Sequence, residues 1–410
     1  MAIDSGDTAF MLVATALVML MTAGLAFFYG GLVRSKNVLT IKMQSFAALG
    51  VVGAVWALIG YTLAFGPDWH GLIGGLQFAG LRDVGMEPGP MFGPGVPGST
   101  IPHEIFMAFQ MMFAIITPAL ISGAFAYRMK FSSYIAFAVV WLLLVYVPLA
   151  HWIWGGGWLA QQGVIDFAGG YVVHMSAGFA ALACVFVFRP RNIPAGENAA
   201  PHNVPFVALG AGLLWFGWFG FNAGSALAAN GIAANAFVTT MLGGSFGMLS
   251  WMALNWWVDG KPSASGAVTG AVAGLATITP ASGYVAPWAA MVIGVLAGSI
   301  CLAATKFRGR RKWDDALDVW ACHGVGGTIG VIATGVFASG AINGQVGLLE
   351  GGTKLLLVQV GAALFVAAYS FWVTYLVLHV MKLIRPIQAS EAEEMGSRDM
   401  QEHAEAAYQF

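Results

Sequence analysis

Two histidines in apolar, glycine-rich surroundings are the residues of this sequence best suited to carry chemistry. His174 lies in GGYVVHMSAG and His323 lies in DVWACHGVGG, with Asp318 five residues before it. An imidazole can donate, accept or relay a proton near neutral pH. One such histidine could equally be a hydrogen-bonded packing residue, but two in matching settings favour a path for a polar species or a proton.

The elements that must position these histidines are membrane helices. Of 410 residues, 58% are hydrophobic and only 9% are charged, which is far from the composition of a soluble protein. A bilayer core about 30 Å thick needs roughly 20 apolar residues per helix. Continuous apolar runs exclude the alternating pattern of a membrane β-barrel. The sequence predicts eleven spans, at about 8–33, 41–65, 101–125, 131–150, 169–188, 204–224, 232–257, 264–281, 286–305, 317–338 and 355–384.

Glycine spacing predicts where the histidines point. Residues three and four apart share a helix face, so His174 lies in line with Gly170 and Gly178, and His323 with Gly327. Glycine faces allow helices to approach closely inside a membrane bundle. We therefore expect both imidazoles to face the interior of the protein rather than lipid.

The order of the predicted spans indicates two halves. Each histidine occupies the fifth helix of a group of five, and an odd number of helices per half makes the second half inverted relative to the first. Inverted repeats place a shared site near the middle of the membrane. The predicted fold is therefore an all-α integral membrane protein with two inverted five-helix repeats and a final long helix.

The basic residues predict the orientation of the chain. All but two of the 18 lysines and arginines fall on one side of the predicted spans, the exceptions being Arg82 and Lys354. Basic residues favour the cytoplasmic side of a membrane. We expect an extracellular N-terminus, an extended extracellular cover at 66–100, and a cytoplasmic C-terminus. Composition alone favours a disordered end for the polar segment after residue 384.

Aromatic residues form a second candidate site. Phe109 and Phe113 are four apart and share a helix face, Trp154 lies in HWIWGGGW, and Phe221 precedes the hydroxyl of Ser225. Ring faces together with a hydroxyl acceptor bind small ammonium-type cations, and such contacts contribute about 2 kcal/mol when desolvated. The predicted spans contain no ring of acidic residues, which argues against an ordinary metal-cation channel.

Five motifs are spread over nearly the whole chain: FYGGLVRSKNVL (28–39), HWIWGGGWLAQQGVIDFAGGYVVHMSAG (151–178), GWFGFNAGSA (217–226), TPASGY (279–284) and DVWACHGVGG (318–327). Together they resemble those of the ammonium transporter family, the Amt/Mep/Rh group, and its bacterial Amt branch in particular. The resemblance implies eleven membrane helices, a homotrimer with one pore per protomer, and inward movement of ammonium or ammonia through the plasma membrane.

The resemblance also assigns roles to individual residues. The positions that match the family's extracellular NH₄⁺ recruitment site are Phe113, Trp154 and Ser225, and those of the pore gate are Phe113 and Phe221, with Phe109 at the entrance. The twin histidines of the conduction path match His174 and His323. Asp166 matches an acid that shapes the recruitment site without touching the ion, and Thr279 matches the threonine of a Thr-Pro motif.

The resemblance divides the chain into a transmembrane domain, 1–384, and a cytoplasmic regulatory tail, 385–410. In this family such a tail docks on neighbouring protomers and serves regulation by a PII signalling protein. Tyr127 stands where a glutamate is usual, and Ala404 where a glycine is usual.

The physical hypothesis is that NH₄⁺ loses its proton and crosses an apolar pore as NH₃. A bare cation in a dry, narrow pore is costly, at about 3 kcal/mol for a charged side chain even on mild scales. The histidines would relay the proton by a separate route, which makes transport electrogenic. We expect a transporter rather than an enzyme, with a lipid bilayer around it and no cofactor, metal site or nucleic-acid partner.

Two alternatives stay open at this stage. The histidines could be axial haem ligands in a membrane electron carrier. The same fold could also serve as an ammonium receptor with little transport, because a receptor needs the same recruitment site.

Overall fold

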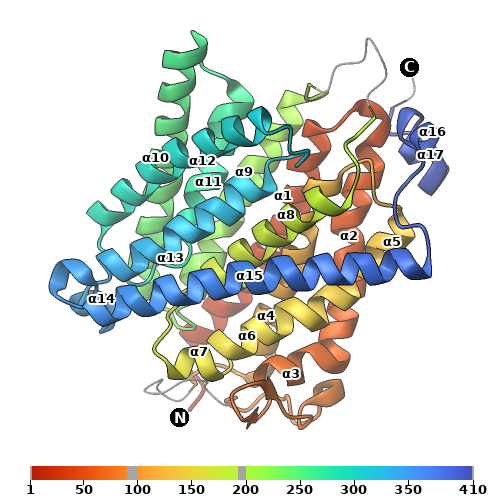
Figure 1. Ribbon diagram of the computed structural model, residues 1–410. Helices are drawn as coiled ribbons and strands as arrows, with labels where there is room; N and C mark the ends of the chain where they lie inside the picture. Colours follow the sequence, from red (N-terminus) through yellow and green to blue (C-terminus); the bar gives the residue numbers. More distant parts are fainter. Residues whose placement is uncertain (1, 90–98, 193–199, 409–410) are drawn as a thin grey trace.

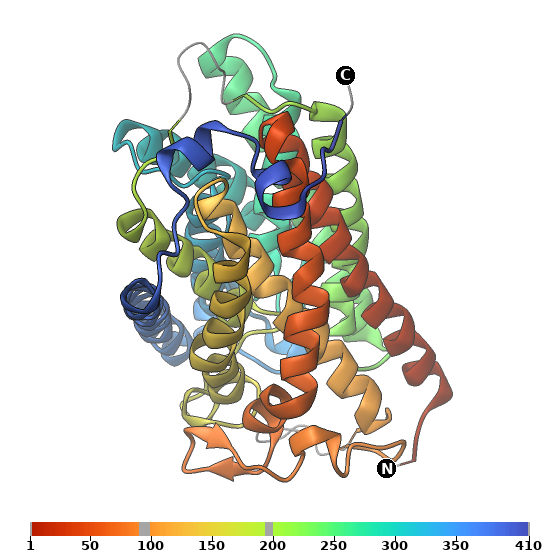
Figure 2. The same ribbon diagram turned by 90° about the vertical axis from the view of Figure 1, so that its right-hand side faces the viewer.

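The computed structural model describes residues 2–89, 99–192 and 200–408 and shows a bundle of long helices (Figure 1). The two termini lie at opposite ends of this bundle in both views (Figures 1 and 2). We name these ends the N-terminal face and the C-terminal face. Strand structure within the described residues is confined to a hairpin of β1 (Asp68–Trp69) and β2 (Ile73–Gly74) on the N-terminal face.

Ten helical segments of the described chain are long and apolar enough to cross a membrane. Several are divided by a π-helical turn, which adds one residue to a helical turn and often occurs at functional sites. The segments are α1 (Ser5–Leu32); α2 (Val38–Val55) with α3 (Tyr61–Phe65); α4 (His103–Ile121); α5 (Phe131–Trp141) with α6 (Val147–Ile153) and α7 (Trp158–Gln161); η6 (Gly170–Met175) with α8 (Ser176–Val187); α9 (Val204–Gly224); α10 (Gly231–Asp259); α12 (Pro287–Arg310); η7 (Trp320–Val325) with α13 (Gly326–Phe337); and α15 (Thr353–Ile384).

The predicted run 264–281 forms a helix that is shorter than the other ten. It forms α11 (Ala264–Ile278), a helix of 15 residues, whereas a straight crossing needs roughly 20. Every predicted run overlaps a helix, so the all-α membrane fold is confirmed, while the count of eleven crossings stays a prediction.

Glycines allow the closest contacts between these helices. A methyl group at Gly270 would lie 2.4 Å from Cβ of Trp251, and one at Gly274 would lie 2.2 Å from the carbonyl oxygen of Gly243. Both glycines therefore let α11 touch the backbone of α10. Gly266, four residues before Gly270, lies instead beside the side chain of Asn255.

The polar segment after α15 is ordered on the C-terminal face. It forms α16 (Glu391–Met395) and α17 (Arg398–His403), seen in blue beside the start of α2 in Figure 1. The carboxylate of Asp399 accepts hydrogen bonds from the backbone N–H groups of Leu39 and Thr40, at 3.0 and 2.8 Å. The tail thus caps α2 of its own chain, and the disordered end favoured by composition is wrong for residues 385–408.

The cover at 66–100 is partly regular. Besides the β1–β2 hairpin, its described residues include a 3₁₀ turn at Ala79–Leu81. A short turn at Asp68 supports the hairpin, because its carboxylate accepts a hydrogen bond from the Gly71 N–H at 2.9 Å. Part of the predicted cover, 90–98, lies outside the described residues.

Candidate functional site

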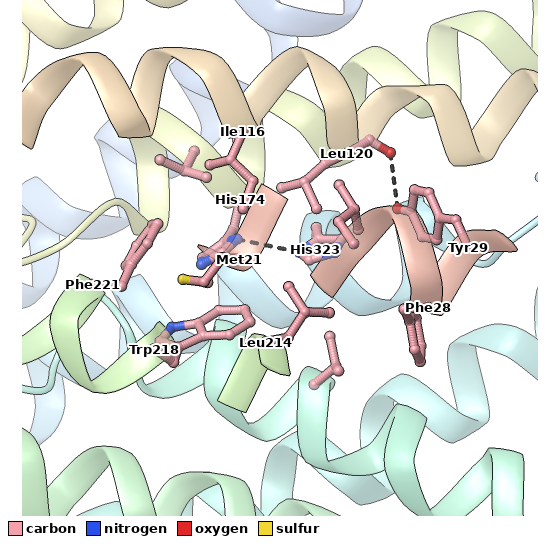
Figure 3. Close-up of a pocket in the computed structure, with 13 residues that line it drawn as sticks. Met21, Phe28, Tyr29, Ile116, Leu120, His174, Leu214, Trp218, Phe221 and His323 are labelled. Carbon is pink, nitrogen blue, oxygen red and sulfur yellow. Dashed lines mark hydrogen bonds between the residues drawn. The ribbon is translucent and has the colours of Figure 1, made fainter. Parts of the chain in front are cut away.

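His174 and His323 meet in the interior of the bundle. Their Nδ1 atoms are 3.2 Å apart, their rings stack at a centroid distance of 5.2 Å, and their side chains are almost wholly buried (Figure 3). A hydrogen bond between two imidazole nitrogens requires that one carries the proton and the other accepts it. In the neutral pair the two rings are therefore opposite tautomers, and the accepting ring carries its own proton on Nε2.

Both histidines lie in π-helical turns, His174 in η6 and His323 in η7. The α-helical faces expected from the sequence are therefore shifted locally. The expected glycine packing is nevertheless present, because a methyl group at Gly178 would lie 2.0 Å from the backbone nitrogen of Gly324. Contact between the two backbones holds the two imidazoles within hydrogen-bonding distance.

Asp318 is not a partner of His323, although it lies five residues before it. Its carboxylate instead accepts a hydrogen bond from the Arg308 guanidinium at 2.7 Å. The haem alternative also fits the geometry poorly. A metal between two axial imidazoles lies about 2 Å from each nitrogen, whereas these Nδ1 atoms contact each other directly.

The histidines border a narrow cavity, which we call the tunnel (Figure 3). Its other walls are almost entirely apolar or aromatic. The polar atoms of Tyr29 and Trp218 are already bonded, to the Leu120 carbonyl at 2.9 Å and to the Thr279 hydroxyl at 2.9 Å. His174 Nε2 has no polar partner in the described part of the chain. The tunnel is lined by Met21, Leu25, Phe28, Tyr29, Ile116, Leu120, Val173, His174, Leu214, Trp218, Phe221, Val272 and His323.

An aromatic stack continues from the tunnel past Phe221. Phe221 lies 6.1 Å from His174 on one side and 4.1 Å from Phe113 on the other, measured between ring centroids. Phe113 also contacts Phe109 at 4.9 Å and meets Trp154 edge-on at 5.9 Å. The structure therefore brings together the four aromatic residues that the sequence assigned to the entrance, the gate and the recruitment site.

Ser225 is oriented as a hydrogen-bond acceptor. Its hydroxyl donates to the Phe221 carbonyl at 2.8 Å, so its one hydrogen is used within the helix end. The oxygen lone pairs remain for a ligand that donates hydrogen bonds. Ser225 is half-buried. An ammonium ion carries four N–H donors and no acceptor, which matches this arrangement.

Asp166 holds the start of the His174 segment. Its carboxylate accepts four backbone hydrogen bonds, from Gly169, Gly170, Tyr171 and Val172, at 2.9, 2.6, 2.8 and 3.3 Å. Burial raises the pKa of the Asp166 carboxyl, and the four N–H donors oppose that shift.

The backbone of Asp166 also holds the Trp154 side chain. Its carbonyl accepts the Trp154 indole N–H at 2.8 Å, so the carboxyl group and the carbonyl hold two parts of the site at once. Asp166 itself is not among the residues that line the tunnel.

Thr279 acts on the tunnel through Trp218, a residue that the sequence reasoning missed. The Trp218 ring stacks on His174 with centroids 5.6 Å apart, and its indole N–H donates to the Thr279 hydroxyl. Trp218 and Phe221 are three residues apart in GWFGFNAGSA, so the spacing rule that paired Phe109 with Phe113 could have found it.

These features define the class of protein. The fold is that of a multi-pass membrane protein, and the site is an apolar tunnel with a histidine pair inside and an aromatic, hydroxyl-bearing entrance. Among the described residues, no group of three or more His, Cys, Asp or Glu side chains could hold a metal ion.

Comparison with known proteins gives the family. The model of the Ammonium Transporter Family matches residues 9–408, so this chain belongs to that family. The ammonium transporter of Bacillus subtilis is 47% identical over 98% of both chains, and ammonium transporter Amt1 of Archaeoglobus fulgidus is 44% identical over 99% of this chain and all of its own.

Solved structures share the fold. The crystal structure of Saccharomyces cerevisiae Mep2 superposes with a TM-score of 0.87 at 34% identity, over 95% of this chain and 88% of that one. A structure described as a sensor Amt protein gives the same TM-score at 29% identity, over 97% of this chain and 98% of its own. The relatives therefore include proteins named as ammonium transporters and a structure described as a sensor.

Proposed function

We propose that this protein recruits NH₄⁺ at the N-terminal face, removes its proton, and passes NH₃ through the tunnel. Phe113, Trp154 and Ser225 bind the ion, by cation–π contact from the rings and by the hydroxyl lone pairs. Phe113 and Phe221 form the gate, with Phe109 beside it. The observation that carries the proposal is the tunnel itself, where the Nε2 atom of His174 has no polar partner in the described residues.

Selectivity follows from the same contacts. K⁺ has no hydrogen to donate to the Ser225 oxygen and no proton to release before the apolar segment. A charged species in that segment would lose its hydration without replacement partners. Ammonia is neutral and can exchange a hydrogen bond with His174 Nε2 on its way.

The proton takes a separate route in this proposal. The two imidazoles share one hydrogen bond, so taking up a proton at one ring can release a proton from the other. Net transport is then electrogenic, because the proton carries its positive charge across the membrane while NH₃ crosses as a neutral molecule. Asp166 and Thr279 keep Trp154, Trp218 and His174 in place.

The remaining parts of the proposal concern orientation and assembly. The N-terminal face is extracellular and the C-terminal face cytoplasmic, in the plasma membrane. The chain crosses eleven times as two inverted five-helix halves and α15, and three copies form a homotrimer with one tunnel each. Residues 385–410 are a regulatory tail for a PII signalling protein, which is supported by the ordered contact of α17 with α2.

The test is current on a solid-supported membrane carrying liposomes with the purified protein. An ammonium jump should give a current and a matched potassium jump should give none. Replacing His174 and His323 together by leucine should abolish the ammonium current. The control is His379→Leu, because His379 lies on α15 outside the tunnel and donates only to the Tyr375 carbonyl.

Other outcomes have distinct meanings. An unchanged current in the double variant would contradict the proton relay. A rise in internal pH without current would mean neutral NH₃ conduction. Silence in both assays would favour a receptor of the same fold.

A further inference from the structure

Gln359 is a polar residue in the second turn of the apolar helix α15, and its side chain is completely buried. Its amide makes three hydrogen bonds to backbone groups. The oxygen accepts from the Ile165 N–H at 3.0 Å, and the nitrogen donates to the carbonyls of Ile165 and Val331 at 2.9 and 3.3 Å. A buried amide is costly unless its donors and acceptor are satisfied, and here its oxygen and nitrogen both have partners.

The partners of Gln359 belong to the two histidine-bearing segments. Ile165 directly precedes Asp166, whose carboxylate caps η6 and whose carbonyl holds the Trp154 indole. Val331 lies on α13, which continues from η7 and His323. One side chain therefore ties the loop before His174 to the helix after His323.

A further contact joins α15 to the same region. The hydroxyl of Tyr171, the residue after Gly170, donates to the backbone carbonyl of Gln359 at 2.6 Å. Tyr171 is also one of the four N–H donors to Asp166. Figure 1 shows α15 as one long helix lying across the bundle, so it provides a rigid support for the loop.

We propose that Gln359 is a positioning residue for transport: its amide clamps Ile165 so that Asp166 holds Trp154 and His174 in their working places. This inference rests on the proposed function for its transport readout. Without the clamp, the 165–169 loop loses two side-chain hydrogen bonds. The Trp154 ring then binds the cation less well, and the His174 segment loses part of its anchoring.

The first variant is Gln359→Met, which keeps the length and volume of the side chain and removes all three hydrogen bonds. The matched control is Thr374→Val, also isosteric and also on α15. It removes the buried bond from the Trp141 indole to the Thr374 hydroxyl, 2.9 Å long, which touches neither the tunnel nor the loop.

The measurement is the ammonium concentration that gives half-maximal current. We expect a rise of about three- to tenfold in Gln359→Met and no change in Thr374→Val. An unchanged value in Gln359→Met, or an equal rise in both variants, would overturn the proposal, because a general packing role would affect both alike.

A second variant, Gln359→Glu, tests the clamp by its hydrogen-bond pattern. A neutral carboxyl group offers Ile165 one donor and one acceptor, as the amide does, whereas a carboxylate offers acceptors only. The quantity compared is the ratio of the half-saturating ammonium concentration of Gln359→Glu to that of wild type at the same pH. This ratio should approach one as the pH is lowered. A ratio independent of pH would contradict the clamp.

Hydrogen–deuterium exchange separates failure of the clamp from failure of the proposed function. Gln359→Met should speed exchange in a peptide covering 165–175, while Thr374→Val should not. If wild type gives no ammonium signal, the proposed function fails, and faster exchange would still support the clamp. Unchanged exchange at 165–175 would overturn it.

Discussion

The two histidine segments are capped in different ways at opposite ends of the bundle. Asp166 lies eight residues before His174, and Asp315 lies eight residues before His323. Asp166 accepts four backbone N–H groups, whereas Asp315 accepts the Trp320 N–H at 2.7 Å and its other oxygen has no partner in the described residues. At the same spacing, therefore, both carboxylate oxygens accept hydrogen bonds in the cap at Asp166, but within the described chain only one does in the cap at Asp315.

The groups that hold these caps also differ. The neutral amide of Gln359 holds Ile165, before Asp166, while the buried guanidinium of Arg128 donates to the carbonyl of Asp314, before Asp315, at 2.7 Å. Arg191 pairs with the Asp314 carboxylate as well, at 2.8 Å.

The two caps differ in the charges around them: one is a single carboxylate, and the other belongs to a network of ion pairs. The cap at Asp166 has one carboxylate among neutral hydrogen-bond partners. The other cap balances its carboxylates with guanidinium groups and connects to the tail, because the Ala389 N–H donates to the Arg128 carbonyl.

The largest expected effect is on transport in Asp166→Ala. The variant lacks the carboxylate that accepts four backbone N–H groups, so the 165–169 loop that holds the Trp154 indole is released. Hydrogen bonds to charged groups contribute about 1.5–3 kcal/mol each. Ammonium current per protein should fall more than tenfold. In Asp315→Ala the current should fall less, because this variant frees fewer backbone N–H groups. Equal losses of current in the two variants would contradict the difference between the two caps.

Arg128→Met should give the largest loss of stability. Removing one partner of a buried ion pair costs about 3–5 kcal/mol. Because Arg191 still pairs with the Asp314 carboxylate, we expect a loss near the lower end of that range, which also includes the lost hydrogen bond to the Asp314 carbonyl. The thermal unfolding midpoint in detergent should drop below that of Gln359→Met, which removes only hydrogen bonds of a neutral amide. If Gln359→Met is the less stable of the two, the contacts of Arg128 with Asp314 do not stabilise the fold more than the amide contacts of Gln359.

Asp315→Asn should change how stability depends on pH. Burial, followed by the charge of Asp318, raises the pKa of Asp315 from 3.8 to about 6. The folded state therefore binds this proton more tightly than the unfolded state, and wild type loses stability as the pH rises from about 4 to above 6.

The asparagine variant lacks this loss. Its free energy of unfolding relative to wild type should rise between pH 4.5 and pH 7.5, by about 3 kcal/mol at most. The thermal unfolding midpoint should rise with it. A difference that stays constant over this range would show that Asp315 does not titrate there.

Thr279→Val should have the smallest effect. The variant loses the acceptor for the Trp218 indole, a bond that contributes about 1 kcal/mol. We expect a two- to fivefold lower maximal current. The matched control is Thr334→Val, because that buried hydroxyl donates only to the Gly330 carbonyl of its own helix.

The sequence predicted the helices because continuous apolar runs leave little choice of structure in a membrane. It also predicted that the histidines face inward, since the glycine spacing of Gly178 and Gly327 marks close-packed faces. The length of α11 was overestimated, because the apolar run continues into the turn after Ile278.

Other parts of the site could not be predicted. Neither π-helical turn has a recognisable signal, since each depends on contacts with the opposite backbone, such as Gly178 against Gly324. Gln359 had one available signal, an amide within a long apolar run, which marks a candidate functional residue. Its partners Ile165 and Val331 are distant in sequence, so only the folded chain identifies them.

The position of Gln359 on α15 has a consequence for how the protein is made. A ribosome delivers helices in chain order, so the segments bearing His174 and His323 enter the membrane before α15. Until α15 arrives, nothing supplies the amide that joins Ile165 to Val331. The site therefore matures late in biogenesis, and a nascent chain that has not yet inserted α15 holds both histidines but not the fixed entrance.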